Sequence, residues 1–247
     1  MARKPRQLTE NGIYHIILRG NNQQNIFCDK QDRLFCINRI RKYSSELKVD
    51  IFGYCLMSNH IHLLLKTENY LSLFVQKLAN SYVFYFNRKY ERSGHLFQGR
   101  FKSEPVEDDG YFKTVLRYIL QNPVKNGNSD FTNFSWSNLK NIIGNINDGI
   151  TNFSLLYNKF GDEISIKDFL LQTEKNRCME YENKFVFPDS KCIEFIMQKL
   201  KIKKPYKFIN LEYKEQKEKI RLLKKNGFSI NQISRITGIS KRIIKSA

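Results

Sequence analysis

The chain has 247 residues, of which 41% are hydrophobic and 27% are charged, and its formal net charge is +18. This hydrophobic content excludes a disordered polyelectrolyte, and no apolar run is long enough to cross a bilayer. Residues 198–247 hold 15 Lys and Arg but only 3 Asp and Glu, so most of the excess charge lies there and favours a nucleic-acid partner.

The first half of the chain alternates between strand-like and helix-like patterns. A β-rich alternation predicts a strand over Gly12–Leu18, and helical spacing predicts a helix over Asp29–Leu47 with Asp29 as its N-cap. The expected elements that follow are strands over Asp50–Met57, His60–Lys66 and about Lys102–Val106, and helices over Tyr70–Tyr90 and from Asp108 to about Gln121, where Pro123 and Gly127 halt it. This order predicts an α+β fold of the ferredoxin-like, split βαβ kind, with an antiparallel sheet.

The second half of the chain predicts two further regions, so the first domain is expected to span residues 1–127. Residues 128–197 are rich in Asn, Ser, Phe and Leu and predict a mostly helical connector, and a basic linker is expected at 199–205. Residues 198–247 predict a basic helix-turn-helix domain with a helix over Tyr213–Lys225, a helix capped by Ser229, a turn at 237–239 and a short last helix. The alternative is a small helical module for packing or dimerisation.

The segment "MSNHIHLLL" (57–65) holds two of the four histidines. Alternate side chains of a strand share a face, so His60 and His62 point one way and Ile61 points the other way. Two imidazoles could hold a divalent ion if oxygen ligands completed the site, which would suit Mg²⁺ or Mn²⁺ bound to phosphate oxygens. For an isolated HxH motif, a hydrogen-bonded structural pair of histidines on an edge strand is the commoner case.

A tyrosine and an amide lie on one side of the helix that ends near Pro123. The apolar stripe expected to pack on the sheet consists of Phe112, Val115, Leu116, Ile119 and Leu120. Tyr118 lies off the centre of this stripe, and Asn122 follows one turn later on the same side. A phenol and an amide oxygen could serve phosphoryl transfer as nucleophile and metal ligand. The alternative is an ordinary packing tyrosine, one of thirteen in the chain.

Three segments have the composition of a nucleic-acid surface. Cations alternate with aromatic residues in the loop after the second long helix, as in a groove for a single strand, at His95, Phe97, Gln98, Arg100, Phe101 and Lys102. A solvated basic loop with Phe97 or Phe101 packed inward is an equally good interpretation. Weaker candidates are Arg19 and Asn21–Gln24, and His15 is interpreted as structural. In the last helix, Lys241, Arg242 and Lys245 are candidates for phosphate contacts on duplex DNA.

Three sequence blocks occur together in one order: "MSNHIHLLL", "SGHLFQGRFKS" and "LRYILQNPVKNG". With them the chain resembles the IS200-like, single-tyrosine HUH transposases, and within these the REP-associated tyrosine transposase (RAYT)-like proteins. The resemblance covers residues 12–145, and the C-terminal helix-turn-helix is similar to an extension of some members.

The resemblance implies a role for each matching residue. His60 and His62 match the metal ligands, Tyr118 matches the catalytic tyrosine, and Asn122 matches a third metal ligand, with Gln121 as its alternative. The implied reaction is metal-dependent cleavage and strand transfer of single-stranded DNA through a covalent 5′-phosphotyrosine, with Mg²⁺ or Mn²⁺ as cofactor. The process would be DNA transposition or the processing of REP-like hairpins. Two alternatives are a non-catalytic DNA-binding regulator derived from a transposase and a metal phosphohydrolase.

The expected partners follow from the same comparison. Single-stranded hairpin DNA would bind the first domain and duplex DNA the last one, with no membrane partner. The N-terminus lacks the apolar core of a signal peptide, so we expect a cytoplasmic, nucleoid-associated protein. The resemblance allows a monomer that uses its own tyrosine or a homodimer that exchanges the tyrosine helix.

Overall fold

The computed structural model describes residues 9–125, 131–172, 189–202 and 204–247. The chain forms two compact units, Met1–Met179 and Glu180–Ala247. Among the described residues, none of the helices combines the length and apolar character that a membrane crossing requires.

The first unit is built on a four-stranded sheet with the strand order β2-β3-β1-β4. Its strands are β1 (Ile13–Arg19), β2 (Asp50–Leu56), β3 (His60–Lys66) and β4 (Lys102–Pro105). All three pairs of neighbours are antiparallel. This order, with one helix after β1 and another after β3, confirms the predicted ferredoxin-like fold.

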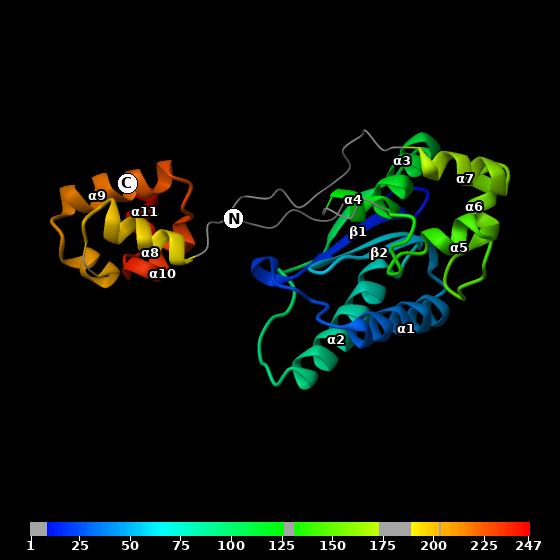
Figure 1. Ribbon diagram of the computed structural model, residues 1–247, viewed down its shortest axis with the longest axis horizontal. Helices are drawn as coiled ribbons and strands as arrows, with labels where there is room; N and C mark the ends of the chain where they lie inside the picture. The colour runs from blue at the N-terminus through cyan, green and yellow to red at the C-terminus, as the bar shows by residue number, and fades with distance from the viewer. Residues whose placement is uncertain (1–8, 126–130, 173–188, 203) are drawn as a thin grey trace. The chain divides into compact units, whose positions relative to one another are not determined.

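Helices cover both faces of this sheet (Figure 1). On one face lie α1 (Lys30–Leu47) and α2 (Leu71–Lys89), packed on the side chains of Ile16 and Leu63. On the other face lies α3 (Asp109–Leu120), packed on Ile13 and Leu64. Because both faces are covered, the central strands β1 and β3 are buried along almost their whole length. Any polar side chain on them therefore needs a partner inside the protein.

The predicted starts of α1 and α3 are confirmed by their N-caps. Asp29 accepts a hydrogen bond from the backbone N–H of Asp32, whose side chain accepts in return from the N–H of Asp29. At α3, Asp108 accepts from the N–H of Tyr111. The short helix α4 (Asn122–Lys125) follows α3 directly, so Pro123 lies in a further helical turn instead of ending the helical path. Gly127, the other expected stop, lies outside the described residues.

Residues 131–172 belong to the first unit because they cover the open edge of β2. They contain α5 (Leu139–Ile143), α6 (Phe153–Phe160) and α7 (Glu163–Leu171). The Asn138 side chain acts as a strand partner: its oxygen accepts from the N–H of Tyr54 (2.9 Å), and its nitrogen donates to the carbonyl of Phe52 (3.1 Å). This coverage protects an edge that would otherwise expose unpaired backbone groups. The division of the chain therefore does not fall at residue 127, where we expected it.

The second unit begins before residue 198, the expected boundary. Its elements are α8 (Asp189–Gln198), a 3₁₀ helix η2 (Pro205–Asn210), α9 (Tyr213–Lys225), α10 (Ile230–Thr237) and α11 (Lys241–Ser246). Cys192 and Ile196 of α8 are fully buried in the core of this unit. Leu200 and Ile202 are buried there too, so the expected basic linker is wrong: its apolar residues alternate with the lysines and pack inward.

The predicted ends of the last two helices match the local structure closely. Ser229 accepts from the N–H of Gln232 and caps α10, and Ser240 accepts from the N–H of Ile243 and caps α11. Between them Gly238 has φ +76°, a left-handed conformation that glycine adopts without strain. Local sequence signals therefore set the ends of both helices.

We expect Asn138→Ala to lower the free energy of unfolding by about 1–3 kcal/mol, because buried backbone groups of β2 lose their partners. Urea denaturation followed by circular dichroism measures this change. Asn38→Ala, on the exposed side of α1, is the control and should change the free energy by less than about 0.5 kcal/mol. Equal losses in the two variants would contradict the role of Asn138 as an edge partner.

Candidate functional site

The two histidines of β3 share one face of the sheet, as the strand alternation predicts. The ring centroids of His60 and His62 are 4.8 Å apart, while Ile61 packs in the opposite core beneath α1 and α2. His62 is 2% exposed, and His60 is half-buried at the end of the strand. The pair therefore forms a small polar group at the edge of an apolar interface.

Asn122 joins this pair from a distant part of the chain. Its Oδ1 lies 3.4 Å from Nε2 of His60, and its side chain is buried. On the other side of the same ring, Nδ1 of His60 lies 2.6 Å from Oδ1 of Asn59. If Nδ1–H donates to Asn59, the lone pair of Nε2 faces the oxygen of Asn122, so two electron-donating atoms converge. That arrangement fits a cation between them.

Gln121, the alternative third ligand, is engaged elsewhere. Its Nε2 donates to the carbonyl of Leu170 (2.8 Å) and to that of Gln172 (2.6 Å). These carbonyls lie at the C-terminal end of α7, so Gln121 attaches the end of α3 to α7. Of the two neighbouring amides, Asn122 is the one that lies against the histidines.

Tyr118 lies beside the histidines but is far more buried than expected. Its ring centroid is 5.8 Å from that of His62 and 6.0 Å from that of His15, edge-on in both cases, and only 1% of the residue is exposed. From the sequence we expected it off the centre of the apolar stripe. It is buried because α3 is enclosed by the sheet on one side and by α5, α6 and α7 on others, all in one core.

A glycine allows α3 to pack this closely. A Cβ on Gly53 of β2 would lie 2.6 Å from Cδ1 of Leu116, well inside van der Waals contact. The missing side chain at Gly53 therefore leaves room for the Leu116 side chain of α3 against the sheet.

His15 belongs to the same cluster, a place that we did not expect for it from the sequence. It is fully buried, with Nε2 2.9 Å from Nδ1 of His62 and Nδ1 3.2 Å from Oε2 of Glu104. The other oxygen of Glu104 accepts from the hydroxyl of Tyr111 (2.7 Å). Burial lowers the pKa of His15, against the raising effect of the hydrogen bond and charge of Glu104. The only sequence signal for His15 as a member of this cluster was a histidine in the first predicted strand.

The cluster offers two imidazole nitrogens and one amide oxygen to a metal. Within the described part of the chain there is no group of three or more His, Cys, Asp or Glu residues suited to hold a metal, so a third ligand must be of another type. Imidazole with neutral oxygen donors leaves coordination positions for phosphate oxygens and water, which suits Mg²⁺ or Mn²⁺.

The predicted single-strand loop lies at the His60 end of the sheet. The N–H of Gln98 donates to the carbonyl of Arg19, which pairs with His60 across β1 and β3. The N–H of Asn21 likewise donates to the carbonyl of Leu96. The loop therefore runs beside the histidines although it lies more than 30 residues away in sequence.

The side chains of this loop divide into two groups. His95, Gln98 and Arg100 are exposed, and with α2 the loop borders a hollow of about 480 Å³. Phe97 is buried in the core near Tyr82, which favours the packing interpretation over base stacking for its ring. Lys102 is half-buried on β4. In the second unit Lys241, Arg242 and Lys245 are all exposed on α11.

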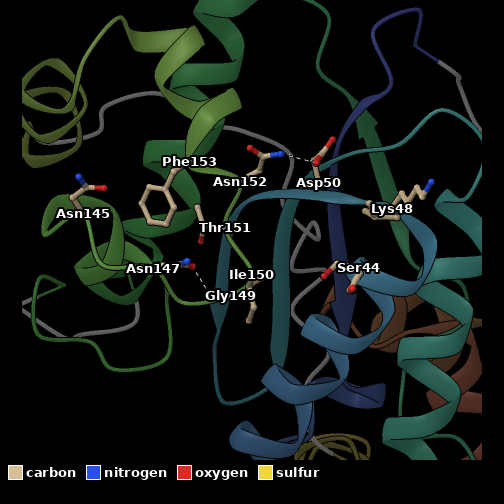
Figure 2. Close-up of a pocket in the computed structure, with 12 residues that line it drawn as sticks. Ser44, Lys48, Asp50, Asn145, Asn147, Gly149, Ile150, Thr151, Asn152 and Phe153 are labelled. Carbon is tan, nitrogen blue, oxygen red and sulfur yellow. Dashed lines mark hydrogen bonds between the residues drawn. The ribbon is translucent and has the colours of Figure 1, made fainter.

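A larger hollow elsewhere has no comparable chemistry. Figure 2 shows it between the end of α1, the start of β2 and residues 145–153, where the Asn152 side chain donates to Asp50 (2.7 Å). Asp50 pairs with Lys66, at the opposite end of β3 from His60. Asn152, which lines this hollow, bonds residues 145–153 to the start of β2. The lining of the hollow contains no histidine, cysteine or tyrosine.

Comparisons with known proteins find a family model and solved structures that are similar to parts of this chain. Residues 9–122 match the family model described as "Transposase IS200 like". The fold is similar to that of a REP-associated tyrosine transposase solved with a REP hairpin, at a TM-score of 0.50 and 15% identity over 61% of this chain and 90% of that one. A putative transposase from Deinococcus radiodurans R1 gives a TM-score of 0.34 and 16% identity over 51% and 97% of the two chains. No curated protein matches the sequence.

The neighbouring amides should differ in their effect on stability. Gln121→Ala should lower the free energy of unfolding by about 1–3 kcal/mol, because the buried carbonyl of Leu170 loses its donor. Asn122→Ala is the matched control and should cost less than about 1 kcal/mol, since its oxygen meets Nε2 of His60 only across a long contact of 3.4 Å. Thermal and urea denaturation in EDTA measure both values. A reversed order would contradict the assignment of the two amides.

Proposed function

We propose that residues 9–122, which match a family model of IS200-like transposases, form a domain that cleaves and rejoins single-stranded DNA through a covalent link to Tyr118. The observation that carries the proposal is the meeting of Tyr118, the β3 histidines and Asn122 in one cluster of a single chain. A nucleophile beside a set of metal donors is what phosphoryl transfer requires. Because the chain's own tyrosine lies against its own histidines, one subunit can supply the whole site.

In this reaction the phenol oxygen of Tyr118 attacks the scissile phosphorus in line. A bond from that oxygen to phosphorus forms while the bond to the 3′ oxygen of the preceding nucleotide breaks. The phenol loses its proton to solvent, and the leaving 3′ oxygen takes one up, which gives a 5′-phosphotyrosine and a free 3′-hydroxyl. The energy of the phosphodiester stays in the new bond, so another 3′-hydroxyl can reverse the step without ATP.

The residues around the tyrosine divide the remaining work. His60, His62 and Asn122 would hold a divalent cation, Mg²⁺ or Mn²⁺, which when bound would polarise the scissile phosphate. Tyr118 is packed within the core between α3 and the sheet, so its ring can take few positions. This restriction favours a fixed line of attack. Because Tyr118 is 1% exposed, DNA must displace part of its cover before the phosphate reaches the phenol.

The substrate proposed for this domain is single-stranded DNA next to a hairpin. The structure with a similar fold was solved with a REP hairpin. In this chain the exposed His95, Gln98 and Arg100 lie on a loop joined by hydrogen bonds to the Arg19 end of β1, which is also the His60 end of β3. A strand that leaves the cluster over this end would meet cations and amide groups there.

The second unit is proposed to bind duplex DNA through α11. Lys241, Arg242 and Lys245 are exposed on this helix, and Ile244 on its other side is fully buried. The helix is therefore held to the unit by its apolar side and presents its charges to solvent. Arg235 of α10 is already paired with Asp189 (2.6 Å), so it adds little to the exposed positive charge.

We expect the native protein, mixed with single-stranded hairpin DNA and Mn²⁺, to form a covalent adduct that survives denaturing electrophoresis. Tyr118→Phe should form none, because phenylalanine has no nucleophilic oxygen. Tyr157→Phe is the matched control: its hydroxyl donates to Asn145 (2.6 Å), and neither residue belongs to the histidine cluster, so its adduct should equal that of the native protein.

Three outcomes would contradict the mechanism. An adduct of equal yield in Tyr118→Phe would place the nucleophile elsewhere. Multiple turnover that releases 5′-phosphate ends without any adduct would indicate a metal phosphohydrolase. Duplex binding by the native protein without cleavage of any single-stranded substrate would support the DNA-binding regulator.

For the second unit, we expect the triple variant Lys241→Ala, Arg242→Ala, Lys245→Ala to bind duplex DNA more weakly on all sequences. The slope of log Kobs against log salt concentration should become less negative, by about 0.9 for each phosphate that these side chains neutralise in the native protein. Fluorescence anisotropy with labelled duplex over a salt series measures this slope. An unchanged slope and affinity would favour the alternative of a packing or dimerisation module.

A further inference from the structure

A buried chain of hydrogen bonds leads from the rim of the sheet to His62. We propose that Glu104 and His15 are positioning residues that fix the tautomer of His62 and so direct the lone pair of its Nε2 toward the metal site. The inference rests on the proposed metal site, and it assigns a function to a histidine that the proposed reaction does not itself use.

The sheet register builds this chain from three strands. His15 of β1 lies directly opposite Glu104 of β4, and Ile17, two residues further along β1, lies opposite His62 of β3. His15 and His62 are therefore diagonal neighbours on one face, close enough for long side chains to meet. Their rings are nearly coplanar, with centroids 5.2 Å apart and planes at 22°, as a hydrogen bond between ring nitrogens requires.

The carboxylate of Glu104 decides which nitrogen donates in each hydrogen bond from Glu104 through His15 to His62. An ionised carboxylate only accepts hydrogen bonds, so Nδ1 of His15 must donate to Glu104 across the 3.2 Å contact. A neutral imidazole then has its lone pair on Nε2, which accepts from Nδ1–H of His62 across 2.9 Å. His62 in turn carries its lone pair on Nε2. The hydroxyl of Tyr111 supports the starting point, because it donates to the second oxygen of Glu104.

The enclosure of His15 supports the neutral form on which this direction depends. His15 is fully buried among apolar side chains of the sheet and α3, where an added charge would be costly. The charged or titratable groups next to it are Glu104 from β4, His62 from β3 and Tyr118 from α3. Of these only Glu104 is partly open to solvent, so the rim is the one place in this chain of contacts where water can stabilise a charge.

His60 reaches the same tautomer by a local route. Its Nδ1 lies against Oδ1 of the preceding residue, Asn59, at 2.6 Å. His62 has Ile61 and Leu63 as neighbours along β3, and both pack in the opposite core, so neither can orient it. Its acceptor must come from another strand, and His15 is that acceptor. Metal-binding histidines generally need such an acceptor for their second nitrogen.

The test measures the tautomer and the metal separately, on the full chain. In metal-free native protein, ¹⁵N NMR of the histidine rings should show the proton of His62 on Nδ1. In His15→Phe, which keeps a ring but removes the acceptor, the proton should move to Nε2, and Mn²⁺ affinity measured by calorimetry without DNA should fall about 10–100-fold. His15→Gln, whose side-chain oxygen can accept, should recover most of the affinity.

Control variants separate positioning from stability. Ile16→Ala removes a fully buried side chain of the same strand from the opposite core, so it should lower the unfolding midpoint while leaving Mn²⁺ affinity and the His62 tautomer unchanged. Glu104 is half-buried at the rim, so Glu104→Ala should disturb folding less than a change at the fully buried His15. This variant should weaken Mn²⁺ binding about 10-fold.

The outcomes distinguish this inference from the proposed function. A proton on Nε2 of His62 in the native protein, or native Mn²⁺ affinity in folded His15→Phe and Glu104→Ala, would overturn the inference. If the native protein binds no Mn²⁺ and forms no adduct, the proposed function fails. The NMR comparison of native protein and variants would still decide whether His15 sets the tautomer.

Discussion

The antiparallel pairing of β1 with β3 is the constraint on which the site depends. In this register Arg19 lies opposite His60 and Ile17 opposite His62, which places His15 on the same face as both histidines of β3. Because strand side chains alternate, a slip of one residue would turn β3's histidines toward α1 and α2. The apolar residues at the intervening positions prevent this slip, since they would then be moved out of the larger core.

A polar cluster can persist inside an apolar interface only if its groups bond to one another. His15, His62, Asn122 and Tyr118 are all at least 95% buried, and an unpaired polar group at such depth costs about 1–3 kcal/mol. The chain of contacts from Glu104 through His15 to His62 reduces that cost and ends at a carboxylate that still reaches solvent. The same contacts also fix the orientation of the His15 and His62 rings relative to each other.

Residues 131–172 support the helix that carries Tyr118 and the strand next to β3. Asn138 and its neighbours complete the open edge of β2, and α7 accepts the side chain of Gln121 at the end of α3. Gly53 leaves space on β2 that the Leu116 side chain of α3 fills. Tyr118 and Asn122 therefore owe their position to contacts on three sides of one helix.

The sequence by itself determined whatever depends on neighbours along the chain: the strands and helices of the ferredoxin-like fold, the cap at Asp29, the shared face of His60 and His62, and the glycine turn at Gly238. Periodicity and capping are local, so they can be read within one element. Only the tertiary structure decided that His15 joins the cluster, that Phe97 packs inward and that Tyr118 is enclosed. These outcomes depend on strand register and on helices from residues 131–172, and contacts between such distant segments leave no periodic trace in the sequence.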